Sequence, residues 1–466
     1  MSGLEVVGAV WRAVDGHEDL LARVELDGPG VTLPSVFGVT ALATASVAGA
    51  LLAVAERVGA ATGSVPPVRV DRRHVALAFA CEREARPVGW EPPPLWDPLA
   101  GDYRSADGWI RLHTNYGHHR AAALRALELP ATAVRADVGA AVSAVKGDEL
   151  EQAVVDAGGC AAVERSLDAW RVHPQGVAVA AEPLVARSVA GAAGAIRSAA
   201  IDPARPLAGV RVLDLTRVIA GPVATRFLAS FGADVLRLDP VGFAEVPALL
   251  VEATAGKRTA ALDLRSRAGR DLLEQILAEA DVLVSGYRPG ALAGLGFGAD
   301  DLAERHPHLI TATLDAYGWT GPWSSRRGFD SLVQMSAGIT DAGRSFVGGD
   351  RPVPLPVQAL DHATGYLLAT AIVRSLNDRD AGLGITATRC SLARTAAWLI
   401  EDGTDAAGAA APPVVGRDHP ALVERVPSAW GPVDRVRPVG DIEGVPARWD
   451  RPPGPLGAEA PAWSVT

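Results

Sequence analysis

The chain has 466 residues, 48 % hydrophobic and 21 % charged, which is typical of folded globular protein and long enough for two or three domains. Its net charge of −10 argues against nonspecific nucleic-acid binding, which requires a basic surface. The three cysteines, Cys81, Cys160 and Cys390, are scattered and odd in number, which excludes a disulfide framework and a Cys-x-x-Cys zinc site and leads us to expect a reducing cytoplasm.

Residues 1–100 are predicted to form an N-terminal segment of helices and strands. Residues 1–20 lack the basic start and apolar run of a signal peptide. The uncharged run 35–55 is long enough to span a bilayer, but its small residues favour a buried helix, so we expect no membrane association. The order helix, glycine-containing turn and strand in residues 39–79 returns in residues 359–400, which suggests a degenerate half-repeat.

Residues 101–187 are predicted to form a small α+β domain. Its expected elements are a strand at 107–112 and helices at 118–129 and 147–157. The histidines of this domain, His113, His118 and His119, have no carboxylate or cysteine beside them at a metal-ligand spacing. We therefore expect no metal site.

Residues 188–205 are rich in small residues and end near two prolines, which predicts a linker. Strands then alternate with helices through residues 206–402. The expected strands are 210–215, 233–238, 281–284 and 309–314, and the expected helices are 223–231, 267–280, 300–305 and 362–376. This alternation predicts right-handed βαβ units and a parallel sheet covered on both faces, with ligands at the carboxyl ends of the strands.

The fold class predicted for the whole chain is therefore α/β: a Rossmann-like parallel sheet domain with a smaller α+β domain. Residues 403–466 are rich in Ala, Pro and Gly and are predicted to form an extended tail with little regular structure. In the sheet domain, Gly221 and Pro222 open a helix directly after a strand, where oriented N–H groups favour anions.

Short motifs from residue 207 to residue 365 resemble, in their order and spacing, those of class III CoA-transferases, the family that includes carnitine- and formyl-CoA transferases and α-methylacyl-CoA racemase. The motifs are 207–216, Ala220-Gly221-Pro222, 232–235, Gly256-Lys257-Arg258, 262–264, Arg288-Pro289-Gly290, Leu295-Gly296, Gly321-Pro322, Gly328-Phe329-Asp330, and Asp361 with Thr364-Gly365. The small domain precedes the sheet here, whereas it follows the sheet in the family. The chain is thus expected to be a rearranged or fused member, and the family implies a homodimer.

The resemblance implies that Asp361 is a nucleophile that forms an aspartyl-CoA thioester during CoA transfer from an acyl-CoA to a carboxylic acid. From the residues alone, Asp361 is equally an ordinary N-cap of the helix that follows. We expect an ionised carboxylate, because an unperturbed aspartate has a pKa of about 3.9, and neighbouring N–H groups that stabilise the oxyanion. Coenzyme A is then a substrate, and no permanently bound cofactor is expected.

The resemblance also implies that five residues line the CoA nucleotide: Val218, Ile219, Lys257, Gly286 and Tyr287. Lys257, Arg258 and Arg288 are expected on loops at the ligand edge of the sheet, where their charges suit the phosphates of CoA. For Arg258 and Arg288 the alternative of solvated surface charges remains open.

Three other functions are weighed against CoA transfer. A nicotinamide-dependent oxidoreductase lacks support, because no Gly-x-Gly-x-x-Gly follows Leu215. A racemase-like or isomerase activity is disfavoured, because the family's racemases have a histidine where this chain has Phe329. A non-catalytic CoA-binding partner subunit is the third alternative.

Overall fold

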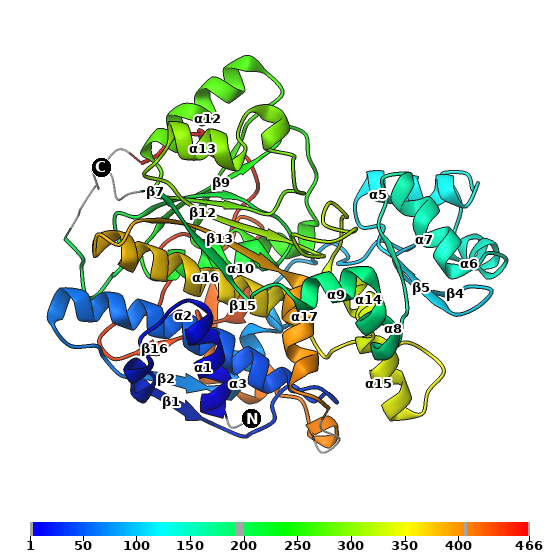
Figure 1. Ribbon diagram of the computed structural model, residues 1–466, viewed down its shortest axis with the longest axis horizontal. Coiled ribbons are helices and arrows are strands. Elements are labelled where there is room, and N and C mark those ends of the chain that lie inside the picture. Colours follow the sequence, from blue (N-terminus) through cyan, green and yellow to red (C-terminus); the bar gives the residue numbers. More distant parts are fainter. Residues whose placement is uncertain (1–2, 192–199, 405–407, 465–466) are drawn as a thin grey trace.

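The computed structural model describes residues 3–191, 200–404 and 408–464. A seven-stranded sheet forms its centre (Figure 1). The strands lie in the order β10 (Lys257–Ala261), β9 (Asp234–Asp239), β8 (Arg211–Leu215), β11 (Val282–Ser285), β12 (Ile310–Asp315), β13 (Ile385–Ser391) and β7 (Ala186–Gly191). The first six are parallel and β7 is antiparallel to β13. Numbered along the chain, the parallel strands run 3-2-1-4-5-6, the doubly wound order that reverses between β8 and β11.

Helices cover both faces of this sheet, as predicted for parallel strands. Its valines, such as Val212 and Val284, pack with helices α10 (Ala220–Ser230) and α16 (Ala359–Asp380). Its leucines, such as Leu213 and Leu283, pack with α12 (Arg267–Glu279) and α13 (Ala299–Arg305) on the other face. The remaining helices of this part are α11 (Leu250–Ala253), α14 (Asp330–Ser336), α15 (Ile339–Val347) and α17 (Leu392–Glu401).

The small domain is an α+β unit at one side of the sheet domain, drawn in cyan in Figure 1. Its elements are β4 (Gly101–Arg104), β5 (Trp109–Leu112), α5 (Gly117–Ala126), α6 (Arg135–Ser143), α7 (Gly147–Asp156) and β6 (Ala161–Val163). The strands form an antiparallel sheet with a separate apolar core around Ile110, Leu124 and Val154. Two short helices, α8 (Leu167–Val172) and α9 (Pro174–Ala180), return the chain toward the sheet.

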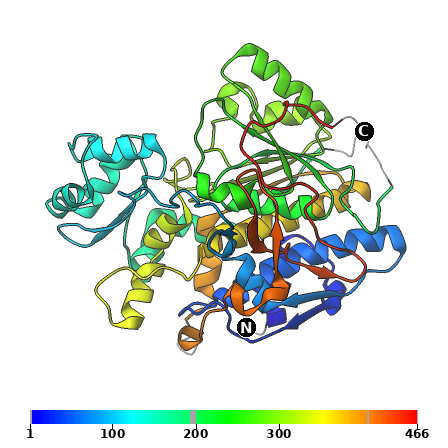
Figure 2. The same cartoon turned by 180° about the vertical axis from the view of Figure 1, so that it is seen from behind.

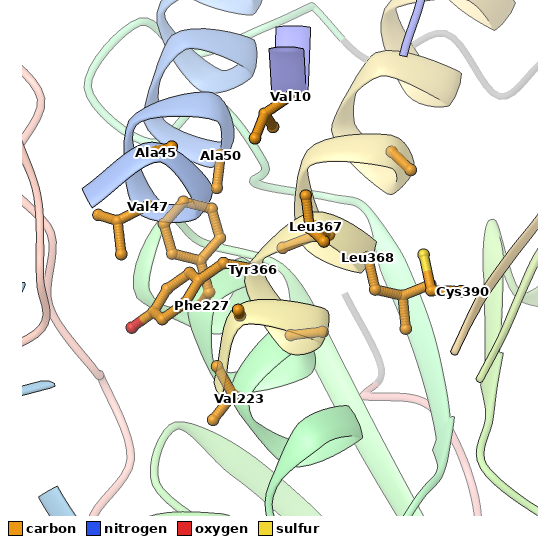
Figure 3. Close-up of a cluster of buried hydrophobic side chains, with 14 of the residues drawn as sticks. Val10, Ala45, Val47, Ala50, Val223, Phe227, Tyr366, Leu367, Leu368 and Cys390 are labelled. Atoms are coloured by element: carbon orange, nitrogen blue, oxygen red, sulfur yellow. The ribbon is translucent and has the colours of Figure 1, made fainter. Parts of the chain in front are cut away.

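The N-terminal segment packs against α16. Its elements are α1 (Gly3–Ala13), β1 (Val24–Asp27), α2 (Val39–Thr62), β2 (Val68–Asp71), α3 (Arg72–Ala78), α4 (Cys81–Glu84) and β3 (Arg86–Pro87). Figure 3 shows Ala50 of α2 and Val10 of α1 beside Leu367 of α16, with Phe227 of α10 closing the cluster. Helix α2 is long and apolar enough, by length and composition, to cross a membrane, but 89 % of its most apolar stretch is buried inside the molecule.

The predicted half-repeat has the same order of elements in both places: α2, β2 and α3 correspond to α16, β13 and α17. In each copy the last residue of the strand caps the next helix, since the side chains of Asp71 and Ser391 accept hydrogen bonds from helix N–H groups. The sequence Gly-x-Leu-Leu-Ala-x-Ala occurs at 49–55 and at 365–371. In this alignment Ala45 is the counterpart of Asp361.

Two predicted segments differ from the structure. Residues 186–191 lie in the predicted small domain and linker but form β7, because backbone pairing with β13 orders them regardless of their small side chains. Residues 192–199 of the predicted linker lie outside the described part. The tail contains β14 (Val423–Val426), β15 (Val433–Val436) and β16 (Asp441–Ile442), which pair with one another or with β3 and β2.

The tail also runs back across the molecule to the edge strand of the sheet, as Figure 2 shows in red. The Thr259 hydroxyl donates to the carbonyl of Pro455, and the Glu459 N–H donates to the carbonyl of Thr259. Trp463 is buried against Ile276. The tail therefore protects β10, a strand that the sequence prediction missed, from unwanted pairing at the sheet edge.

Candidate active site

Two cavities meet at Asp361. The first has a volume of about 270 Å³ and the second about 330 Å³, and both are lined by Asp361, Tyr116, Val218 and Phe329. The second cavity contains Leu215 and Gly286, which end or follow β8 and β11. It therefore lies where the strand order reverses, the place at which doubly wound sheets bind ligands.

Asp361 lies in the first turn of α16, two residues after Ala359, and Gln358 is the N-cap. The prediction that Asp361 precedes the helix was therefore wrong by three residues. Only 7 % of Asp361 is exposed. Burial first, and then the neighbouring charges of Asp330 and Glu82, raise the pKa of Asp361 well above its ordinary value. The expectation of a freely ionised carboxylate was wrong, because the sequence did not reveal these two acidic neighbours.

The Asp330 carboxylate is hydrogen-bonded to the first turn of α16. One of its oxygens accepts hydrogen bonds from the N–H groups of Leu360 (2.8 Å) and Asp361 (2.9 Å), and Gln334 donates to the other. Burial raises the pKa of Asp330 to about 6 despite these hydrogen bonds. Hydrogen bonds stabilise the Asp330 carboxylate, whereas no described residue donates a hydrogen bond to the Asp361 carboxyl. If only one of the two carboxyl groups is protonated, the proton therefore favours Asp361. The two N–H groups are committed to Asp330, contrary to our expectation that they serve an oxyanion.

His362 follows Asp361 on α16 but lines neither cavity. Its Nε2 lies 3.1 Å from a carboxylate oxygen of Glu82, and its ring stacks on Phe79. The ligand atoms of Cys81, Glu82 and His362 lie within 4.8 Å of one another, a grouping that the sequence did not suggest. However, Arg226 donates to the Cys81 sulfur at 3.1 Å, and burial raises the pKa of this thiol, so the group is better suited to hydrogen bonding than to a metal.

The second cavity is rich in arginine: Arg217, Arg288, Arg326 and Arg327 line it. Arg326 forms an ion pair with Glu151 of the small domain at 3.1 Å. Within residues 3–191, 200–404 and 408–464, no carboxylate pairs with the other three. The Arg217 guanidinium lies over the ring of Phe243 at 3.6 Å and near that of Tyr287 at 5.1 Å. Such a site can bind phosphates with its cations and a base with its aromatic rings.

Of the predicted CoA contacts, Val218, Gly286, Tyr287 and Arg288 line the second cavity, and Ile219 lines the first. Sequence reasoning missed Arg217, Arg326 and Arg327. For Arg217 a signal was present, since it lies two residues after the first strand of the parallel sheet, at the ligand edge. The other two lie in an irregular segment, which no pattern in the sequence placed near the site.

Val218 has a left-handed backbone conformation, with φ of 65°, which is strained for a β-branched residue. Its N–H donates to Glu245 at 3.3 Å. Glu245 also accepts a hydrogen bond from the Tyr116 hydroxyl (2.5 Å) and pairs with Arg237 (3.0 Å). Glu245 therefore joins the small domain to the strained turn after β8.

Lys257 and Arg258 were predicted to lie on a loop, but they begin strand β10. The Lys257 amino group is fully buried and donates to Asp214 at 2.9 Å, and Arg258 pairs with Asp234 at 3.1 Å. Neither residue lines either cavity. Burial lowers the pKa of Lys257 to about 8 in spite of Asp214. These two ion pairs lie within the sheet and away from both cavities.

Comparisons with known proteins find similarity to CoA-transferases over part of the chain. Residues 207–426 match the model of CoA-transferase family III. A probable fatty acyl-CoA transferase of Mycobacterium tuberculosis is 36 % identical over 192 residues, which are 38 % of this chain and 48 % of that protein. A succinyl-CoA:glutarate CoA-transferase of Mus musculus is 34 % identical over 190 residues, 38 % of this chain and 43 % of that protein.

A crystal structure of the Mycobacterium tuberculosis protein Rv3272 has 33 % sequence identity, covers 43 % of this chain and 56 % of that chain, and superposes with a TM-score of 0.40. The chain thus spans about half or less of the length of these two curated relatives. Residues 207–426, slightly less than half of this chain, are thus similar to CoA-transferase family III.

Proposed function

We propose that the chain transfers CoA from an acyl-CoA to a carboxylic acid through an aspartyl-CoA thioester on Asp361. One observation carries this proposal: among the described residues, Asp361 is the only carboxylate that lines both cavities. The arginine-rich second cavity suits the phosphates and base of CoA. The first cavity then receives the acyl group, and the thioester bond lies between them at Asp361.

The reaction proceeds by exchange of acyl bonds. An oxygen of ionised Asp361 attacks the thioester carbonyl, the CoA thiolate leaves, and a mixed anhydride forms. The thiolate attacks the aspartyl carbonyl and releases the first acid, which keeps one oxygen of Asp361. The second carboxylate attacks the aspartyl thioester, and the same steps in reverse give the new acyl-CoA and the free enzyme.

The small domain contributes to this chemistry by excluding water. Tyr116 lines both cavities, and His113 lines the first. Water at the anhydride would hydrolyse it, so closure over Asp361 favours transfer. Asp361 must lose a proton before it attacks, and its raised pKa requires transfer to become faster as the pH rises.

The test is exchange between a radiolabelled free acid and its unlabelled CoA ester. The full chain should catalyse exchange, and Asp361→Ala should lose it by several orders of magnitude while still binding CoA. A chain that binds CoA but does not catalyse exchange with any acid would support the non-catalytic alternative. Near-normal exchange by Asp361→Ala would exclude the mechanism.

An acyl-CoA isomerase is the second candidate, because His113 of the small domain stacks on Phe329 at 3.6 Å and lines the first cavity. The His113 ring is therefore a base beside Phe329, the position at which the family's racemases have a histidine. Burial lowers the pKa of His113 to about 3, which makes it a weak base and favours CoA transfer. Exchange of the acyl α-hydrogen with solvent deuterium, lost in His113→Ala, would support the isomerase.

We also propose a cytoplasmic protein that uses CoA as a substrate without a permanently bound cofactor. The three cysteines are buried and unpaired, as suits a reducing compartment. The homodimer implied by the family stays a prediction that sedimentation analysis can test. The first cavity is built from the N-terminal segment, the small domain and the sheet domain of a single chain, and the second from the small domain and the sheet domain.

A further inference from the structure

The first cavity differs from the second in its charged groups. Arg111 pairs with Asp102 at 2.6 Å and also lies against the ring of Trp96. Arg83 is exposed and donates to the carbonyl of Pro356 at 2.7 Å. Glu82 is paired with His362. Asp102 and Arg111 therefore neutralise each other, whereas Arg83, which is exposed, pairs with no carboxylate among the described residues.

His113 adds a polar group to this wall but not a charge. Burial lowers its pKa to about 3, so its ring is neutral at physiological pH. Its stacking on Phe329 also fills one of its faces. A carboxylate that entered this cavity would meet Asp361 and the Asp102–Arg111 pair, and it would find no uncommitted cation in the buried wall.

The rest of the wall is largely hydrocarbon. It includes Leu95, Val246, Leu249, Met335, Pro352 and Pro354. The fixed φ angles of the prolines stiffen one side of the cavity. A volume of about 270 Å³ open to water-sized groups leaves room for a short hydrocarbon acyl chain.

We propose that the first cavity binds an uncharged, mainly hydrocarbon acyl group and selects against acyl groups with a second carboxylate. This assignment rests on the proposed function for the placement of the thioester at Asp361. Each buried methylene should increase affinity by about fourfold. A second carboxylate would lose its hydration without gaining a cation.

Binding of CoA thioethers tests this assignment without requiring turnover. Calorimetry with the full chain would compare CoA, S-hexyl-CoA and S-(3-carboxypropyl)-CoA. S-hexyl-CoA should bind at least about tenfold more tightly than the carboxylated thioether. Equal binding of the two, or tighter binding of the carboxylated one, would overturn the assignment. Loss of isotope exchange with retained preference for the hexyl thioether would refute only the proposed function.

A blocking substitution locates the preference in the first cavity. Leu95 lies on a loop and lines this cavity, so Leu95→Trp should fill space without disturbing a helix or strand. It should weaken S-hexyl-CoA by about tenfold or more and CoA itself by less than about threefold. Leu383→Trp is the matched control, because Leu383 is 69 % exposed and lines neither cavity. Equal weakening of both ligands by Leu95→Trp, or no weakening, would contradict the proposal.

Discussion

Replacing Asp330 by asparagine should make Asp361 more acidic. The Asp361 nitrogen is 2.9 Å from an Asp330 oxygen, and covalent geometry then keeps the two carboxyl groups within about 7 Å of each other. At an effective dielectric constant of about 20, two unit charges at this distance repel by about 2–3 kcal/mol, or about two pKa units. Because Asp330 is itself partly protonated near its pKa of about 6, we expect a shift of about one to two units.

The assay is the pH profile of kcat/KM for CoA transfer, which reports ionisations of the free enzyme. The rate should rise with pH as Asp361 loses its proton, since only the carboxylate attacks. In Asp330→Asn this rise should occur at lower pH. The variant also replaces the charged oxygen that accepts hydrogen bonds from the first turn of α16, which should lower the free energy of unfolding by about 1–3 kcal/mol.

Asp281→Asn is the control for that loss of stability. Asp281 is also buried and accepts a backbone hydrogen bond, from Arg211 at 2.9 Å, but it lies before β11 at the opposite end of the sheet. In Asp281→Asn, kcat/KM should rise at the same pH as in the parent. If a folded Asp330→Asn has an unmoved profile, or one displaced to higher pH, then Asp330 does not raise the pKa of Asp361.

Three further predictions concern stability and CoA binding. Asp361→Asn should be more stable than the parent at about pH 8 and equal to it near pH 4, because a protein loses stability with rising pH when a carboxyl group has a raised pKa in the folded state. Urea unfolding of both proteins at both pH values measures this. The same difference in unfolding free energy at the two pH values would contradict it. Val218→Gly should relieve strain and raise the free energy of unfolding by about 0.5–2 kcal/mol while weakening CoA binding; lower stability would show that the turn is unstrained. Arg217→Ala should weaken the binding of CoA by about 1–3 kcal/mol but leave the binding of a pantetheine thioester unaffected. Lys257→Met should lower the melting temperature of the protein without changing its affinity for CoA. The reverse pattern would restore Lys257 as a CoA ligand.

The parallel sheet could be predicted because its strands are continuous apolar runs between helices with strong periodicity. Strand β10 was missed because it begins with Lys257 and Arg258, whose charges suggested a loop. Only the structure shows that Asp214 and Asp234, distant in sequence, neutralise these charges. The edge strand β7 was missed for the opposite reason, since its small residues carry no apolar pattern.

The position of Asp361 followed from the motif resemblance, but its environment did not. Glu82 comes from the N-terminal segment and Asp330 from α14, and neither is near Asp361 along the chain. The raised pKa therefore depends on tertiary packing that a local pattern cannot encode. The same holds for the contribution of the small domain, whose Tyr116 reaches Glu245 of the sheet domain.

The central claim is that Asp361 exchanges an oxygen with the substrate acids. Turnover with an acceptor acid labelled with oxygen-18 in its carboxylate, followed by mass spectrometry of the proteolytic peptide that contains Asp361, tests it directly. The mechanism predicts that Asp361 acquires the heavy oxygen, because the acid attacks the aspartyl thioester and the resulting anhydride is cleaved at the acyl carbonyl. Active transfer with no heavy oxygen in Asp361 would contradict it.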